Sequence, residues 1–188
     1  KHYSPVIREK AAKKLAGLQA VDELAEALKH PDPRVRRSVC EGISNDAWFF
    51  RGLEGRSKSA LTPAQVSAAF LPYFVKTLEK STVPGKVALW ETDEVLYAFS
   101  KARPADIRAN LPLITPWLKH EDWYLRESAF YAMLGLRDTI TIDELCTMGE
   151  VFAAEVHSKA QSNYAGGFKY LFGKLKVKLS DAALARFA

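Results

Sequence analysis

The sequence is poor in cysteine and glycine and has no long apolar run, and these scarcities exclude several classes of protein. Two cysteines and ten glycines among 188 residues are too few for a disulfide-dense domain or a collagen-like fibre. The longest apolar runs are far shorter than the roughly 20 residues of a transmembrane helix, so we expect no membrane association. A hydrophobic content of 48% and a net charge of +5 are typical of a folded globular chain.

The chain also lacks the short patterns that mark common catalytic and cofactor sites. It contains no phosphate-binding loop, dinucleotide fingerprint, nucleophile elbow or His-Glu-x-x-His helix. The histidines do not have the spacing of a zinc site: His2, His30, His120 and His157. Cys40 and Cys146 each stand among apolar neighbours, so we expect buried free thiols, with a disulfide as the alternative. We therefore predict no metal and no cofactor.

The start of the chain bears on its location. The first residue is Lys1 and no apolar signal-peptide core follows it, so we expect a fragment or mature form of a longer polypeptide. This favours a cytoplasmic location without fixing the compartment. No pattern indicates the oligomeric state.

Charge is distributed unevenly along the chain. The sequence pI of 9.1 permits DNA or another polyanion as a partner without requiring one. The basic excess is local, because residues 121–155 hold 2 basic and 8 acidic residues whereas residues 156–188 hold 6 and 1. We therefore expect a surface with separate acidic and basic regions.

The strongest signal is an internal repeat. Residues 21–38 align with residues 111–128 at an offset of 90, so that Leu-Lys-His at 28–30 matches the same tripeptide at 118–120. The two copies also share an aspartate, an arginine and a serine: Asp32 with Asp122, Arg36 with Arg126, and Ser38 with Ser128. A partial third copy places residues 71–78 against residues 111–118. Such a period, about 30 to 40 residues, is typical of helical repeat proteins.

This spacing and motif resemble the HEAT-like repeat family. The resemblance extends from about Ser4 to about His157 and is most specific at the turns 28–36 and 118–126. It implies an all-α fold, a right-handed α-solenoid of about five antiparallel helix pairs. We expect a single repeat domain over residues 1–188, with an inserted loop at 45–60 and an atypical C-terminal segment at 159–180.

The residues of the motif have structural roles that their chemistry predicts. Asp32 and Asp122 each precede an apolar helical stripe, where a carboxylate accepts hydrogen bonds from free backbone N–H groups, so we predict two N-caps. Pro33 stands at the first helical position, which needs no amide hydrogen. The resemblance implies that Arg36 and Arg126 are inter-repeat arginines, partly buried and bonded to carboxylates or helix-end carbonyls.

Apolar periodicity and capping signals predict helices throughout and no strand. Capping boxes at 62–65 and 141–144 mark two helix starts. Pro72 and Pro116 fall inside predicted helices and should kink them. The expected ranges are about 5–16, 20–30, 33–44, 63–80, 87–102, 105–119, 123–136, 142–158, 161–173 and 181–187.

The candidate binding residues are four tryptophans and one arginine. Trp48 and Arg51 lie in the inserted loop, and loops on rigid scaffolds often carry recognition. Trp123 begins a similar aromatic string at a repeat turn, and Trp90 and Trp117 complete the set. Packing between repeats is the alternative role for these rings.

Residues 90–132 also resemble the HEAT-like alkylpurine DNA glycosylases. Those proteins carry a tryptophan followed one helical turn later by a carboxylate, as do Trp90 and Glu94 or Asp93. They also carry a Pro-Trp turn before an aromatic-Leu-basic helix, which residues 116–117 and 124–126 match. The resemblance implies a positively charged groove in which Glu94 or Asp93 is catalytic and aromatic rings hold a cationic base.

This second resemblance has three departures. The doubled tryptophan of that family is absent, Glu127 stands where a DNA-binding groove calls for a basic residue, and the pattern assigns no third aromatic residue, Tyr170 being the one candidate. We therefore expect a noncatalytic interaction or scaffold module that binds a macromolecular partner, foremost a protein, on its concave surface. The alternative is a DNA alkylation-repair glycosylase-like protein that binds DNA in a basic aromatic groove. A third possibility is a structural spacer within a longer polypeptide.

Overall fold

The computed structural model describes residues 4–44, 60–83, 85–136, 139–141 and 143–149. The chain divides into two compact units, residues 1–135 and 136–188, and most of the described residues belong to the first. Every regular element in the described ranges is helical, which confirms the predicted all-α class. None of the helices in these ranges is both long and apolar enough to cross a bilayer.

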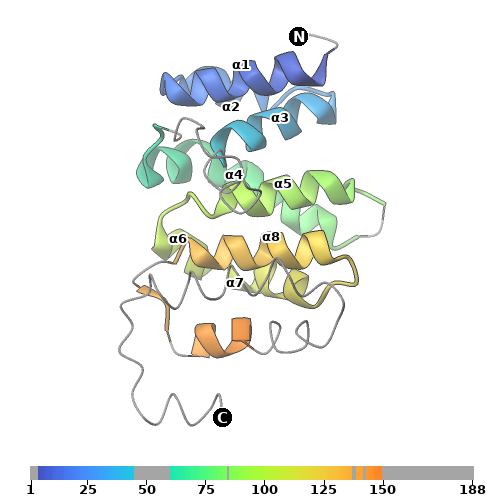
Figure 1. Cartoon of the computed structure of the whole chain (residues 1–188), viewed down its shortest axis with the longest axis vertical. Helices are drawn as coiled ribbons and strands as arrows, with labels where there is room; N and C mark the ends of the chain where they lie inside the picture. The colour runs from blue at the N-terminus through green and yellow to red at the C-terminus, as the bar shows by residue number, and fades with distance from the viewer. Residues whose placement is uncertain (1–3, 45–59, 84, 137–138, 142, 150–188) are drawn as a thin grey trace. The chain divides into compact units, whose positions relative to one another are not determined.

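The first unit consists of two rows of helices (Figure 1). One row contains α1 (Pro5–Gly17), α3 (Pro33–Ile43), α5 (Leu89–Phe99) and α8 (Trp123–Leu134). The other contains α2 (Val21–Ala27), α4 (Pro63–Ser81) and α7 (Leu111–Ile114), with α6 (Pro104–Ala109) before α7 and the 3-10 helix η2 (Thr115–Lys119) after it. In the first row α1 packs on α3, α3 on α5 and α5 on α8, while α2 contacts α4 and α4 contacts α7 in the second.

Side-chain caps begin three of these helices, as the sequence predicts. Asp32 and Asp122 each accept a hydrogen bond at 2.9 Å, from the backbone N–H of Arg34 and of Tyr124. Thr62 and Gln65 form a reciprocal capping box at the start of α4. In the second unit, Thr141 and Glu144 exchange the same pair of bonds at the start of the helical residues 143–149. These bonds satisfy N–H groups that have no partner within the helix.

Two kinds of contact hold the helices of the first unit together. Aromatic rings fill the space between α4 and α5, where the ring centre of Phe74 lies 6.5 Å from that of Phe70 and 5.7 Å from that of Phe99. Backbone approaches backbone between α1 and α3, because a Cβ atom built on Gly42 would lie 2.8 Å from the carbonyl carbon of Ala12. Only glycine allows so close a contact.

The predicted helix over 105–119 is wrong in its continuity. The structure divides it into α6, α7 and η2, whereas the aligned residues 71–78 lie within the unbroken α4. Both segments have a proline at the second aligned position, Pro72 or Pro112. Only the later segment has another proline four residues on, Pro116, whose missing N–H and fixed φ end the α-helical bonding. The expected kink at Pro116 is therefore a complete break, and the chain continues as a 3-10 turn.

Other helix limits differ by a few residues. The helix expected over 20–30 ends at Ala27, because residues 28 and 29 already form a turn, and the helix expected over 87–102 is α5. The expected helices 161–173 and 181–187 and the segment 159–180 lie outside the described residues, as does the predicted loop apart from residue 60. The single domain over residues 1–188 stays a prediction.

Candidate functional site

The repeated motif forms the same hydrogen bonds in both copies. The NH1 group of Arg36 donates to the carbonyls of residues 30 and 31, each at 2.9 Å. The NH1 group of Arg126 donates to the carbonyls of residues 120 and 121 at 2.7 and 2.6 Å. Both guanidinium groups thus bind the turn that precedes their own helix, which agrees with the predicted bonding of these arginines to carbonyls. The same bonds in both copies of the motif indicate a structural role for these two arginines.

The histidines of the motif have a role that sequence reasoning missed. In the first copy, the Nδ1 atom of His30 accepts the backbone N–H of Asp32 at 3.0 Å. In the second copy, His120 accepts the backbone N–H of Asp122 at the same distance. An accepting Nδ1 leaves the proton of the neutral ring on Nε2. The recurring His-x-Asp spacing was the available signal, and it marks a turn that positions the capping aspartate.

Arg36 also connects α3 to α5 through a buried carboxylate. Its Nε and NH2 groups donate to the two carboxylate oxygens of Glu91 at 2.6 and 3.0 Å. The hydroxyl of Tyr73, from α4, donates to Glu91 at 2.7 Å. Burial raises the pKa of Tyr73 far above its usual value, and the carboxylate of Glu91 adds to the shift. Three helices therefore meet at one carboxylate that the sequence analysis did not single out.

Arg37, the next residue, contacts the candidate residues on α5. Its NH2 group donates to Glu94 at 3.2 Å, and its Nε lies 3.0 Å from a carboxylate oxygen of Glu41. Its guanidinium carbon stands 5.7 Å from the ring centre of Trp90, within the range of a cation–π interaction. The indole and the carboxyl that the glycosylase resemblance assigns to a cationic base are thus both in contact with a cation of this chain.

The environment of Glu94 favours its neutral form. The residue is 4% exposed, and burial raises its pKa to about 8, with Glu41 and Asp93 adding to the shift and Arg37 opposing it. Glu94 is therefore largely protonated at neutral pH. A buried neutral acid in contact with arginine is poorly placed to stabilise a developing positive charge on a substrate.

The second candidate acid, Asp93, faces α8. Its Oδ1 atom accepts a hydrogen bond from Ser128, the serine of the second motif copy. One helical turn later on α5, Tyr97 is enclosed between the same helices, and burial raises the pKa of its hydroxyl, with the carboxylates of Glu127 and Asp93 adding to the shift. The contact between α5 and α8 therefore gathers two carboxylates around one tyrosine.

The predicted tryptophan sites differ in accessibility. Trp117 is 6% exposed, and its ring centre lies 5.4 Å from that of His120, so it packs within the fold. Trp123 is half-buried at the start of α8, with its ring centre 3.8 Å from that of Tyr124. Trp48 and Arg51 lie outside the described residues. Of the predicted binding residues, the structure places only Trp90 and Trp123 on an accessible surface.

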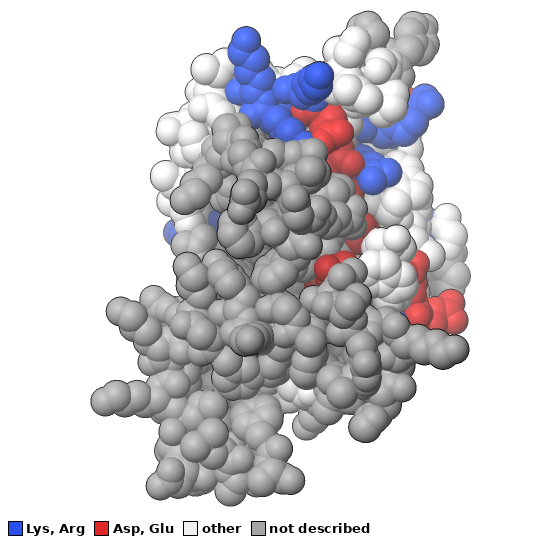
Figure 2. Space-filling model, viewed as in Figure 1, with Lys and Arg blue, Asp and Glu red and all other residues white. Residues whose placement is uncertain are grey.

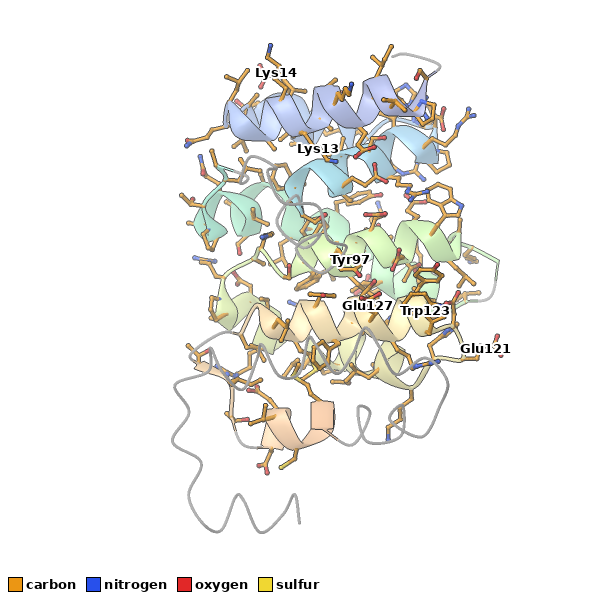
Figure 3. All side chains as sticks on the ribbon, viewed as in Figure 1. Lys13, Lys14, Tyr97, Glu121, Trp123 and Glu127 are labelled. Atoms are coloured by element: carbon orange, nitrogen blue, oxygen red, sulfur yellow. The ribbon has the colours of Figure 1, made fainter. Side chains whose placement is uncertain are left out.

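These side chains define the α3–α5–α8 face, by which we mean Arg37, Glu41, Trp90, Asp93, Tyr97, Trp123, Tyr124 and Glu127. Lys and Arg side chains gather at the α1 end of this view of the molecule, and Asp and Glu side chains continue toward α8 (Figure 2). Tyr97 on α5 and Glu127 on α8 lie near each other, with Trp123 one turn earlier on α8 (Figure 3). Basic and acidic side chains are thus separated on this side of the first unit, whereas the basic stretch 156–188 of the predicted separation lies outside the described residues.

Neither metal nor thiol chemistry is indicated in the part of the chain that the structure describes. No group of three or more His, Cys, Asp or Glu side chains there could hold a metal ion. Cys40 and Cys146 are both buried and free, and burial raises the pKa of the Cys40 thiol. A buried thiol of raised pKa is a packing residue, not a nucleophile.

Comparison with known proteins finds a protein of similar fold but identifies no family for the chain. No protein-family model matches the chain, and no curated protein has a similar sequence. Among solved structures, the chain is similar to an engineered protein determined by the Northeast Structural Genomics Consortium, with a TM-score of 0.52 and 14% sequence identity, covering 100% of this chain and 90% of that one. An identity this low shows likeness of fold alone.

Proposed function

We propose that the chain is a HEAT-like α-solenoid and a noncatalytic scaffold that binds a protein partner on its α3–α5–α8 face. In this proposal the helices form a right-handed stack of about five antiparallel pairs. Two observations support the repeat architecture: the motif makes the same bonds at Arg36 and at Arg126, and helices contact their successors along two rows. Stacks of this kind leave an extended surface for binding.

The position of Arg37 carries the functional part of the proposal. This residue joins α3 to α5 by contacting Glu94 and Trp90, so the two groups expected of a glycosylase serve an interhelical contact. What the face offers to a partner is aromatic and carboxylate surface, including Tyr124, which is 46% exposed beside Trp123. Aromatic residues are enriched in protein interfaces.

Charge also favours a protein over DNA as the partner. A DNA-binding groove gains most of its sequence-independent affinity from cations that contact phosphates. On α5 the charged residues are Glu91, Asp93 and Glu94, with no lysine or arginine. The two basic residues that reach α5 from α3, Arg36 and Arg37, are bonded to Glu91 and Glu94. The glycosylase alternative therefore has little support from the geometry of the described residues.

Site-specific photo-crosslinking tests the proposal. A benzophenone amino acid replaces Tyr124 on the face in one variant and the exposed Glu79 on α4 in a matched control. Each variant is irradiated in an extract of the source cells, and the crosslinked peptide is identified by mass spectrometry. We expect one protein to be captured from position 124 and not from position 79, and to bind the purified chain.

Two results would contradict the proposal. One is equal crosslinking from both positions, or no binding of the captured protein to the purified chain. The other is release of a methylated purine from duplex DNA by the chain, abolished in a folded Glu94→Gln variant. The second result would make the chain a glycosylase.

A further inference from the structure

The helix α1 exposes apolar side chains on the face that points away from the rest of the first unit. Val6, Ile7 and Leu18 are 54, 46 and 67% exposed. They make up half of the exposed large apolar side chains in the described residues, the others being Val83, Leu89 and Tyr124. A single exposed apolar residue is ordinary, but several on one element mark a contact surface.

The spacing along α1 places two of these residues on one stripe. Ile7, Ala11, Lys14 and Leu18 are separated by four, three and four positions, which makes them neighbours along one face of a helix. Leu18 follows the last residue of α1, and its backbone N–H still donates to the carbonyl of Lys14 at 2.9 Å. All four residues are exposed, and we call them the α1 stripe. Helices pack on other helices through stripes with this spacing.

The opposite face of α1 already packs on a helix in this way. Ala12 is buried and lies close to Gly42 of α3. Lys13 lies on the α3 side of α1 and Lys14 on the other side (Figure 3). Burial raises the pKa of Glu41 on α3, and the ammonium of Lys13 is among the charges that oppose the shift. The inner face of α1 therefore combines small residues with a lysine near a carboxylate of the next helix, and the α1 stripe has the same composition.

The helix α2 exposes charge of the opposite sign beside α1. The two helices are in contact and lie at one end of the two rows (Figure 1). The exposed charged residues of α1 are both basic, Lys10 and Lys14, whereas those of α2 are all acidic: Asp22, Glu23 and Glu26. Glu26 pairs with Lys29 at 2.8 Å. No hydrogen bond or ion pair connects the side chains of Lys10, Lys14, Asp22 or Glu23 to another described residue.

A second copy of the chain carries the surface that matches this one. When α1 of each copy lies on α2 of the other, the lysines of one copy meet the carboxylates of its partner, and a two-fold axis makes every contact twice. Packing of α1 on α1 would instead bring lysines together.

The α1 stripe fits other occupants less well. Lys14 interrupts the continuous apolar face that a helix on a membrane surface needs. Val6, Ile7 and Leu18 contribute nothing to contacts with the phosphates of a nucleic acid, which depend on cations. Aliphatic contacts together with charges of both signs are the chemistry of a protein interface.

We propose that the α1–α2 end, which consists of the α1 stripe with Lys10, Asp22 and Glu23, is a dimerisation surface on which α1 of one copy packs against α2 of a second copy. The proposal goes beyond the scaffold function and does not depend on it, because the α3–α5–α8 face contains none of these residues. A contact made by one pair of helices from each copy is small, so the dimer is weak and forms in proportion to concentration. Such a dimer presents two copies of the α3–α5–α8 face, which raises the avidity for a partner with two sites.

Sedimentation velocity of the whole chain tests the proposal, at concentrations from about 1 to 300 μM, which include a dimer with a micromolar Kd. We expect a monomer–dimer equilibrium that weakens as the salt concentration rises. The lysine variant Lys10→Glu, Lys14→Glu and the acid variant Asp22→Lys, Glu23→Lys should each dimerise at least tenfold more weakly. Mixed together, the two variants should form a heterodimer, because each then meets charges opposite to its own.

Control variants separate the interface from overall charge and from folding. Lys76→Glu, Lys80→Glu changes two exposed lysines of α4 that have the same spacing, and it should dimerise as the wild type does. Circular dichroism verifies the fold of each variant. Leu18→Gln alters an exposed apolar residue without changing charge and should weaken the dimer several-fold, so it tests the surface even if the acid variant unfolds α2.

The proposal is overturned if the wild type stays monomeric at the highest concentration, or if the folded lysine variant or Leu18→Gln dimerises as the wild type does. Failure of the two folded charge variants to associate with each other would also overturn it. A monomer that binds anionic vesicles or duplex DNA, with binding lost in the lysine variant, would assign the face to a lipid or a nucleic acid instead. None of these results bears on crosslinking from position 124, so the scaffold function is tested separately.

Discussion

Arg36 and Glu91 form a two-bond ion pair across 55 residues of sequence, with distances of 2.6 and 3.0 Å. The same arginine donates its NH1 group to the turn before its own helix. One side chain therefore fixes a turn within a repeat and joins that repeat to the next. Arg126 makes the same turn bonds in the second copy of the motif.

Arg36→Ala should destabilise the chain strongly. The change leaves the carboxylate of Glu91, 7% exposed, buried without its cation, which costs about 3–5 kcal/mol. Arg34→Ala, which breaks an exposed pair with Asp32, serves as the control and should change stability far less. Urea unfolding at neutral pH measures both. A loss of stability in Arg36→Ala no larger than that in Arg34→Ala would contradict the interhelical role.

The capping bond of Asp122 should stabilise α8 without taking part in binding. Asp122→Ala removes the acceptor of the Tyr124 backbone N–H and should cost about 1 kcal/mol. Asp122→Asn retains an acceptor and should cost much less. Thermal unfolding of the two variants, together with crosslinking from position 124 in each, measures both effects. Loss of crosslinking at unchanged stability would mean that Asp122 is a binding residue and not a cap.

Gly42 should tolerate no side chain, because α1 and α3 touch there through their backbones. The Cβ of Gly42→Ala would lie 2.8 Å from the carbonyl carbon of Ala12, and forcing these helices apart should cost about 1–3 kcal/mol. Gly17→Ala is the matched control, because nothing lies within 4 Å of its Cβ position. It should be neutral or stabilise α1 by up to about 1 kcal/mol. A stability of Gly42→Ala equal to that of Gly17→Ala would show that α1 and α3 do not approach in this way.

Glu94 should make the fold less stable as the pH rises. Its pKa is raised from an ordinary 4.5 to about 8 by burial, with Glu41 and Asp93 adding to the shift. The folded chain therefore binds a proton that the unfolded chain has already lost between these values. The contribution of Glu94 to the free energy of unfolding is complete below its unfolded pKa of 4.5. It is lost as the pH rises from 4.5 to about 8, by up to about 1.4 kcal/mol per pH unit.

Comparison with Glu94→Gln isolates this effect from the other titrating groups. The glutamine is always neutral and keeps an oxygen for Arg37, so the variant should gain stability relative to the wild type as the pH rises from 5 to 9. Urea unfolding at each pH measures the difference. A difference that is constant across this range would show that Glu94 does not titrate between the two pH values.

The helices of the first unit could largely be predicted from the sequence, because their signals are local. The caps at Asp32, Thr62 and Asp122 occur at the expected residues, each set by a bond to a backbone group two or three residues away. The one serious error, the single helix over 105–119, followed from treating Pro116 as a kink. Pro112 and Pro116 each remove one backbone donor, and the chain leaves the α-helix at Asn110 before α7 and again at η2 after it.

The candidate site could be predicted only in part, because it depends on contacts between distant residues. Trp90 and Glu94 were predicted to lie on one helix face, because residues four positions apart are neighbours on the surface of a helix. Their shared partner, Arg37, comes from α3, 57 residues before Glu94. No local pattern tells which of the acidic residues 91, 93 and 94 meets which arginine, since neighbouring positions on a helix point to different helices. The packing of α5 between α3 and α8 decides this.

Crosslinking from the α3–α5–α8 face tests the central claim most directly, that the chain binds a protein partner there. The chain with a benzophenone amino acid at position 124 and the matched chain with it at position 79 are irradiated in the same extract, and each captured protein is then tested for binding to the purified chain. We predict that position 124 captures one protein that binds the purified chain and that position 79 does not capture it. Equal capture from both positions would contradict the claim.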